Sequence, residues 1–372
     1  MADFKTEWYS VDNIDDIDSP ALLVYEDRIK ENIRLLTDIK SDKDLLRPHV
    51  KTNKMSEVSA LMMQQGLTKF KCATIAEAEM LAMLSAPDVL LAYQPVGPKA
   101  VRFIHLIKAY PATRFSCLVD NEKSAVFLND LAKANHLLVD VFIDLNIGMN
   151  RTGILPSAGK ALADSMISLS NLKLRGLHAY DGHIRDTDIA IRKKNCDSGF
   201  DGVLSLQEYV QNKHHSALTI VAGGTPTFPI HAKRNNVECS PGTFVFSDWG
   251  YKHLLPDEPF DYAALVLTRV VSIVNNNTIC TDLGHKSVAA ENPLPQRVYF
   301  LNAPHVQTTG QSEEHLVLKV DDASLFNIGD VLYGVPLHIC PTVALYEKAI
   351  VIENHAAVKE WSVVARNRFI NI

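Results

Sequence analysis

The chain has 372 residues, of which 47% are hydrophobic and 22% are charged, and its formal net charge is −6. This composition excludes collagenous, disordered and coiled-coil proteins, and the length suits two domains or one large barrel with an appendage. The mildly acidic balance argues against nucleic acid as a partner, and no apolar stretch is long enough to span a membrane.

The cysteines and the first residues indicate the compartment. The six cysteines lie far apart with no C-x-x-C spacing, so we expect reduced thiols rather than a disulfide framework or a zinc knuckle. The segment MADFKTEWYS begins acidic and lacks the apolar stretch of a secretory signal. We therefore expect a cytoplasmic protein that acts on a small molecule.

Runs of apolar and β-branched residues of strand length recur along the first two thirds of the chain. They span residues 21–25, 45–50, 70–75, 89–93, 114–119, 137–144, 172–179, 218–222 and 237–239. Between them, apolar residues recur at helical spacing, as in 28–39, 56–65, 75–84 and 121–134. Strands that alternate with helices predict a parallel sheet, and about eight such units predict a (β/α)8 barrel.

After about residue 255 the pattern changes to short runs of period two. These runs span residues 264–273, 278–282, 297–301, 315–320, 343–353 and 362–366. They predict a second, mostly antiparallel β domain, to which residues 7–17 add a strand. The sequence therefore divides into a barrel over 18–255 and a β domain over 256–372 together with 1–17.

Polar residues follow five of the predicted strands directly. They occupy residues 47–54 (RPHVKTNK), 94–97 (QPVG), 144–153 (DLNIGMNRTG), 178–183 (HAYDGH) and 223–227 (GGTPT). A single such stretch is an ordinary turn. Five in succession, at the strand ends where barrel enzymes carry their chemistry, indicate a functional site.

Lys51 ends the second strand run, where a lysine is well placed to form a Schiff base. A lysine at an exposed strand end is the structural alternative. We expect Lys54 to lie in the following helix, and no other lysine to follow a strand beside the glycine motif. Gly223, Gly224 and Thr225 offer main-chain N–H groups and a hydroxyl to a phosphate. A lysine and a phosphate site in one barrel predict pyridoxal phosphate as cofactor.

His338 and Cys340 are the candidate metal ligands of the second domain. If they lie on a strand, their i, i+2 spacing places both side chains on one face, where they could bind one metal ion. Two ligands are an incomplete set, and a buried cysteine beside an ordinary histidine is the alternative. His178 and His183 flank a turn and could equally be loop residues.

At these residues the sequence resembles the D-threonine aldolases and D-serine dehydratases, which share the alanine-racemase-like barrel of fold-type III pyridoxal-phosphate enzymes. The resemblance covers nearly the whole chain. Its motifs are residues 18–22 (DSPAL), 47–52 (RPHVKT), 72–79 (CATIAEAE), 149–153 (MNRTG), 180–183 (YDGH), 223–225 (GGT), 240–243 (SPGT) and 338–342 (HICPT).

The resemblance implies a role for each residue around the cofactor. Lys51 would form the Schiff base, Arg151 would donate to the ring oxygen, and Tyr180 would line the ring. The phosphate would be held by Gly223, Gly224, Thr225, Gly242 and Thr243.

The resemblance also implies a metal, a base and an oligomer. His338 and Cys340 would bind a divalent metal, zinc or manganese, near the substrate's β-hydroxyl, and His183 would be the catalytic base. The family usually shows K-T-H-K where this chain has Asn53, so the role of that histidine falls to Asn53 or is dispensable. Family members are usually dimers, which implies a homodimer.

Two lyase reactions on β-hydroxy-D-amino acids fit these residues. In an aldolase, which we favour, His183 takes the β-hydroxyl proton and D-threonine yields glycine and an aldehyde. In a dehydratase acting on D-serine or 3-hydroxyaspartate, Lys51 takes the Cα proton and the products are a 2-oxo acid and ammonia. The His-x-Cys pair resembles the dehydratases, and Y-x-G-H resembles the aldolases. Weaker alternatives are a racemase, which needs a second base, and a pyridoxal-phosphate carrier, which needs no metal.

Overall fold

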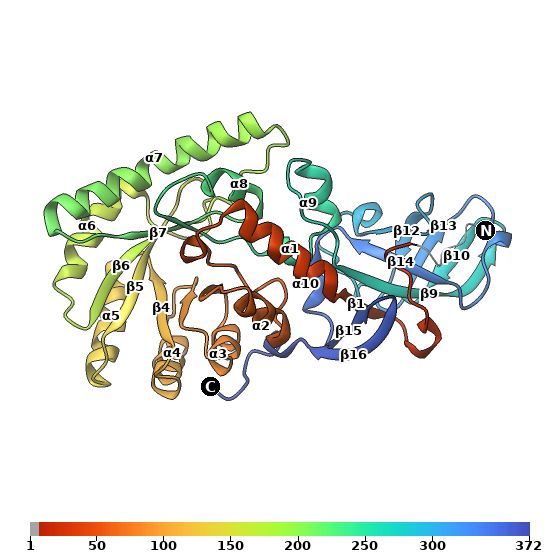
Figure 1. Cartoon of the computed structure of the whole chain (residues 1–372), viewed down its shortest axis with the longest axis horizontal. Helices are drawn as coiled ribbons and strands as arrows, with labels where there is room; N and C mark the ends of the chain where they lie inside the picture. The colour runs from red at the N-terminus through yellow and green to blue at the C-terminus, as the bar shows by residue number, and fades with distance from the viewer. Residues whose placement is uncertain (1–6) are drawn as a thin grey trace.

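The computed structural model describes residues 7–372, which form a barrel and a second sheet that lie next to each other along the long axis of the molecule (Figure 1). The barrel is built from parallel strands with helices outside, and the second sheet is mostly antiparallel. The predicted fold class, a (β/α)8 barrel with a mostly antiparallel β domain, is therefore confirmed.

Seven parallel strands form most of the barrel wall, in the order in which they occur along the chain. They are β2 (Lys69–Cys72), β3 (Asp88–Leu91), β4 (Arg114–Val119), β5 (Val139–Leu145), β6 (Leu172–Ala179), β7 (Thr219–Ala222) and β8 (Val237–Cys239). Residues 46–50 occupy the eighth position. Parallel bridges join Leu46 to Cys239 of β8 and His49 to Lys71 of β2, so this short segment closes the barrel.

Helices connect the strands and cover the barrel. They are α1 (Glu26–Ile39), α2 (Ser56–Gln64), α3 (Ile75–Met83), α4 (Pro98–Ala109), α5 (Glu122–Ala134), α6 (Pro156–Ile167), α7 (Ile189–His214) and α8 (Phe228–His231). Thr74, Asn121 and Asp188 precede α3, α5 and α7, and each side chain accepts a main-chain N–H of the first turn. No helix of the described residues combines the length and the apolar character that membrane crossing requires.

The second sheet has nine strands. They are β1 (Ala21–Tyr25), β9 (Ala264–Asn275), β10 (Thr278–Thr281), β11 (Val298–Phe300), β12 (Gln307–Gln311), β13 (Leu316–Lys319), β14 (Val331–Pro336), β15 (Lys348–Glu353) and β16 (Ala356–Ser362). The main path runs β12-β13-β10-β9-β1-β15-β16, and β14 pairs with β9 and β11. Two short helices, α9 (Trp249–Leu254) and α10 (Ile339–Val343), lie between this sheet and the barrel (Figure 1).

One predicted barrel strand belongs to the other sheet. Residues 21–25 form β1, which pairs parallel with β15 and antiparallel with β9, so their expected place in the barrel was wrong. All five residues of β1 are buried. An apolar run that is buried on both faces has the same sequence pattern in a barrel as at the centre of a mixed sheet.

The strand predicted in residues 7–17 was also wrong. This segment forms turns and one 3₁₀ turn (Ile14–Asp16). Tyr9 and Ile17 pack with Leu265 and Tyr333 of the second sheet, and Asp12 N donates to His355 O. The apolar residues therefore attach the segment to the sheet through side-chain packing without strand pairing.

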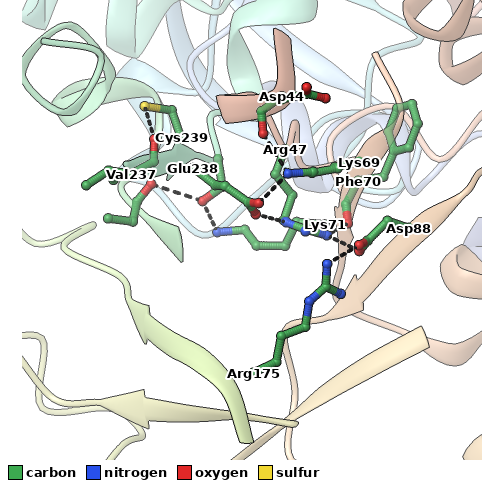
Figure 2. Close-up of polar contacts among 12 residues, drawn as sticks. Asp44, Arg47, Lys69, Phe70, Lys71, Asp88, Arg175, Val237, Glu238 and Cys239 are labelled. Atoms are coloured by element: carbon green, nitrogen blue, oxygen red, sulfur yellow. Dashed lines mark hydrogen bonds and ion pairs between the residues drawn. The ribbon is translucent and has the colours of Figure 1, made fainter. Parts of the chain in front are cut away.

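Paired charges lie inside the barrel near the amino ends of its strands (Figure 2). We call this group the lower layer. Arg47, from the closing segment, is 0% exposed, and its guanidinium donates to Glu238 Oε2 at 2.6 Å and to Asp88 Oδ1 at 2.7 Å. Lys69 Nζ donates to Glu238 Oε1 at 2.6 Å, and Arg175 pairs with Asp88. Each buried charge in this layer thus has at least one opposite partner, which offsets its loss of hydration.

Replacing Arg47 with methionine tests the contribution of this layer. The R47M variant leaves Glu238 and Asp88 buried with fewer partners, so the free energy of unfolding should fall by about 3–5 kcal/mol. Urea unfolding followed by circular dichroism measures the loss. The control is Arg34→Met, because Arg34 pairs with Glu31 and Asp38 on the exposed face of α1. Equal, small shifts in both variants would contradict the role of Arg47.

Candidate active site

Three cations surround the ring of Tyr180 at the carboxyl end of the barrel. The distances to the ring centroid are 5.8 Å for Lys51 Nζ, 5.4 Å for Lys71 Nζ and 5.1 Å for Arg151 Cζ. They come from the turn after the closing segment, from β2 and from the loop after β5. Within residues 7–372 none of the three forms an ion pair with a carboxylate, so the site carries an excess of positive charge that suits an anionic ligand.

The five residues predicted to hold a phosphate lie together beside this ring. Gly223, Gly224 and Thr225 follow β7, and Gly242 and Thr243 follow β8. The Thr225 hydroxyl joins the two loops, because it accepts from Gly242 N at 3.3 Å and from Thr243 N at 3.1 Å. Main-chain N–H groups therefore gather at the end of β7 and β8, which is where barrels commonly bind phosphate.

Two of these glycines have physical reasons to lack a side chain. Gly223 has φ +78°, and a Cβ on it would lie 2.8 Å from the ring of His231. A Cβ on Gly242 would lie 2.9 Å from His49 O. Both loops thus pack closely against the barrel, which keeps their N–H groups in place.

Lys71 is the site residue that the sequence analysis missed, since Lys51 was expected to be the only lysine beside the glycine motif. Lys71 is 2% exposed, and its Nζ donates to Ser240 Oγ at 2.5 Å. Burial and the charge of Lys51 lower the pKa of Lys71 to about 7. The detectable signal was the alternation of Lys69 and Lys71 with Phe70 and Cys72, which places both lysines on one face of β2.

His178 and Asp144 form a buried pair at the same end of the barrel. His178 Nδ1 lies 2.7 Å from Asp144 Oδ1, and Gln94 and Thr152 each donate to Asp144 Oδ2 at 2.8 Å. Burial lowers the pKa of His178, although Asp144 opposes this effect. The neutral ring donates from Nδ1, and Nε2 has no partner among the described residues. His178 is thus an oriented core histidine with one free acceptor.

The predicted metal pair contacts as expected but does not lie on a strand. His338 follows β14 and precedes α10, and Cys340 lies in the first turn of α10. The strand placement was wrong because Pro341 stands in that first turn, where its missing N–H costs no hydrogen bond. The bend between β14 and α10 nevertheless brings the imidazole of His338 and the thiol of Cys340 into contact.

Polar neighbours contact both side chains of this pair. Glu291 Oε1 lies 2.7 Å from His338 Nδ1, and Thr52 Oγ1 lies 3.1 Å from Cys340 Sγ. Burial lowers the pKa of His338, but Cys340, Asp248 and Glu291 outweigh it and raise that pKa to about 9. Burial raises the pKa of Cys340, but His338 outweighs it, so the net shift is downward. A cysteine sulfur and a histidine nitrogen together are a donor set that suits zinc, which would bind them in their deprotonated forms.

A cavity of about 160 Å³ opens beside His338. Arg185, Asp248 and Tyr251 line it, and Arg185 Nε donates to Gly182 O at 2.8 Å. Burial raises the pKa of Asp248 to about 6, although its hydrogen bonds from Tyr251 N and Ile339 N oppose this shift. The cavity has room for a small side chain next to the metal pair.

His183 lies on the loop after β6 and is exposed. Its ring covers Gly148, where a Cβ would lie 2.6 Å from His183 Nε2 and where φ is +126°. The imidazole is therefore accessible to solvent. Its role as catalytic base stays a prediction.

A second cluster lies buried behind the Gly223 loop. His231 Nε2 lies 2.8 Å from Asp181 Oδ2 and 3.3 Å from Cys196 Sγ. Thr227 Oγ1 donates to Asp181 Oδ1 at 2.7 Å and accepts from Gly224 N at 3.3 Å. The potential metal-ligand atoms of Asp181, Cys196 and His231 lie within 4.8 Å of one another. These residues come from three separate segments, so no local sequence pattern indicates the cluster.

A barrel joined to a β domain, with cations and two glycine loops at the carboxyl end of the barrel, defines an alanine-racemase-like protein. Residues 24–248 match the alanine racemase N-terminal domain, and residues 263–352 match the putative serine dehydratase domain. The chain belongs to the alanine-racemase-like family, in the group that contains the D-threonine aldolases and D-serine dehydratases. The resemblance found in the sequence is thereby confirmed.

Individual relatives include both aldolases and dehydratases. D-threonine aldolase of Arthrobacter sp. is 25% identical over 94% of this chain and 93% of its own length. D-threo-3-hydroxyaspartate dehydratase of Delftia sp. is 22% identical over 93% of this chain and 97% of its own. The crystal structure of D-threonine aldolase from Filomicrobium marinum superposes with a TM-score of 0.86 at 26% identity, over 94% of this chain and 96% of that one.

The lowered pKa of Lys71 predicts a pH-dependent cost to stability in the cofactor-free protein. The pKa of Lys71 is about 7 in the folded protein, against 10.5 for an ordinary lysine. At any pH below 10.5, folding must therefore either release the proton of Lys71 or bury its charged ammonium, and both cost free energy. This cost is complete below pH 7 and disappears as the pH rises toward 10.5. Lys71→Met removes it, so the variant should melt at a higher temperature than the parent at pH 6.5, with a smaller difference at pH 9.5. A difference that is constant with pH would contradict the shift.

Proposed function

We propose that this protein is a pyridoxal-phosphate- and divalent-metal-dependent lyase that acts on β-hydroxy-D-amino acids, with cleavage to glycine and an aldehyde as its reaction. The observation that carries this proposal is the set of three unpaired cations around Tyr180, next to the cradle of Gly223 and Gly242. An anion with a flat ring and a phosphate fits this combination. The relatives named above support the substrate class.

The cofactor fits the residues at the barrel mouth. Lys51 would bond to its aldehyde carbon, Arg151 would donate to its ring oxygen, and Tyr180 would cover its ring. The phosphate would be bound by Gly223, Gly224, Thr225, Gly242 and Thr243. When bound, pyridoxal phosphate supplies an electron sink for the pair released at Cα.

The metal fits the His338 and Cys340 pair. Glu291 lies at His338 Nδ1 and orients the ring, so Nε2 would be the nitrogen that binds the ion, and Thr52 contacts Cys340 Sγ. When bound, a divalent ion polarises the β-hydroxyl of the substrate. The thiolate favours zinc over manganese.

The position of the base separates the two reactions. For cleavage, His183 would accept the β-hydroxyl proton, and its exposure lets it pass that proton to solvent. For elimination, Lys51 would take the Cα proton instead. The dehydratase remains the second candidate because the Cys340 thiolate at the metal site suits loss of hydroxide as well as it suits cleavage.

We also propose how the chain is organised and where it acts. A unit over 18–255, apart from β1, which belongs to the second sheet, would carry the cofactor, and a unit over 256–372 with 1–17 would carry the metal pair. All six cysteines are free, which supports a reducing compartment such as the cytoplasm. The enzyme would act as a homodimer.

Product analysis tests the reaction. Purified protein loaded with pyridoxal phosphate and either zinc or manganese is incubated with D-threonine and, separately, with D-serine. We expect acetaldehyde and glycine from D-threonine, in equal amounts. A 2-oxo acid and ammonia as the only products would replace the aldolase with the dehydratase, and no turnover of either substrate would contradict the lyase.

Removal of the metal ligands tests the metal site. His338→Ala and Cys340→Ala should each lose the bound metal and the activity while keeping the visible absorbance of the bound cofactor, because the pair lies at the metal and not at the cofactor. Elemental analysis and absorbance give the two readouts. The control is Cys280→Ala, since Cys280 lies on β10 of the second sheet. Metal that persists in both variants but disappears in Cys196→Ala would place the ion at the Asp181 cluster.

A further inference from the structure

The barrel interior gives Lys71 no counter-ion. Its side chain is buried, and its single hydrogen bond within the described residues goes to Ser240 Oγ. An ammonium group has three N–H donors, so two of them have no acceptor in the part of the chain that the structure describes. A buried charge in this condition is unfavourable in a purely structural role.

Lys69 shows how a lysine of the same strand is paired when a carboxylate lies within reach. It lies two residues earlier on the same face of β2, and its Nζ donates to Glu238 Oε1 at 2.6 Å and to Asp44 O at 2.7 Å. Figure 2 shows Lys71 next to these paired residues, but no ion pair among the described residues includes it. The difference between the two lysines is that Lys71 lies one layer closer to the barrel mouth.

The free donors of Lys71 lie beside the site already described. Its Nζ lies 5.4 Å from the centroid of the Tyr180 ring, a distance close to the 5.8 Å of Lys51 Nζ. Its partner Ser240 Oγ in turn donates to Gly223 O at 2.8 Å. Gly223 is the first residue of the proposed phosphate site. Ser240 thus contacts both the amino group of Lys71 and the first residue of the proposed phosphate site.

We propose that Lys71 is a second lysine of the cofactor site, whose ammonium is held by Ser240 and donates to an acceptor atom of bound pyridoxal phosphate, while Lys51 carries the covalent link. This inference rests on the proposed function, because it takes that cofactor as the ligand. Lys71 is a positioning residue: it forms no covalent bond and strengthens binding by one charge-assisted hydrogen bond.

Cofactor titration tests the proposal. Cofactor-free parent protein, Lys71→Met, Ser240→Ala and the matched control Lys69→Met are titrated with pyridoxal phosphate, and circular dichroism checks that each is folded. Lys71→Met should raise the dissociation constant at least tenfold, the loss expected for one hydrogen bond to a charged group. Ser240→Ala should raise it by less, because the charge remains, and Lys69→Met should bind like the parent.

A parallel titration with pyridoxal, which lacks the phosphate, identifies the acceptor. A loss confined to pyridoxal phosphate assigns the hydrogen bond to the phosphate. An equal loss with both ligands assigns it to the ring. Either pattern supports Lys71 as a cofactor-binding residue.

Borohydride reduction of the loaded parent, followed by peptide mapping, separates failure of this inference from failure of the proposed function. A pyridoxyl group on Lys51 together with parent-like affinity of Lys71→Met overturns the role of Lys71 alone. A pyridoxyl group on Lys71 overturns both its positioning role and the assignment of Lys51. A parent that neither binds nor is labelled overturns the proposed function. If Lys71→Met does not fold, unchanged affinity of Ser240→Ala overturns the inference.

Discussion

The rest of the structure depends on the ion pairs of Arg47, which close the barrel. The closing segment joins its neighbours by isolated bridges rather than by a full strand ladder. Arg47 adds a charged link, because it donates to Glu238 of β8 and to Asp88 of β3 across the interior. Lys51 stands four residues later, at the end of the same segment. The position of the proposed covalent lysine is therefore set by a buried salt-bridge network beneath it.

Charged side chains are paired at one end of the barrel and unpaired at the other, among the residues that the structure describes. The lower layer is compensated, since Arg47 and Lys69 face Glu238 and Asp88. The mouth is not, because Lys71 and the other cations around Tyr180 have no carboxylate partner among the described residues. Low polarity around the lower layer strengthens its pairs, and the same low polarity makes unpaired charge at the mouth attract an anion strongly. One interior thus supplies both stability and binding.

The second sheet contributes the other half of the site through one short helix. The β14 strand pairs with β9 and directs the chain into α10 at the junction with the barrel. Cys340 there lies 3.1 Å from Thr52 and 3.6 Å from Thr243, both of which belong to barrel loops. A metal at this junction would face the substrate from the side of the β domain. The residues proposed to bind the cofactor and the metal therefore come from both parts of the chain.

Local patterns in the sequence determined the fold class and located the glycine loops, and they led to the prediction that His338 and Cys340 bind a metal. The alternation of strand and helix periods is a property of short segments. So is a glycine such as Gly223, where a Cβ would collide with a neighbouring side chain. The bend that carries His338 was misread as a strand, since its apolar and β-branched residues suit both. The tertiary structure alone decided that β1 joins the second sheet, because an apolar run buried on both faces does not specify its neighbours. It alone also distinguished Lys71, which is buried without a carboxylate partner among the described residues, from Lys69, which is partly exposed and paired with Glu238, because residues distant in sequence decide both burial and partners.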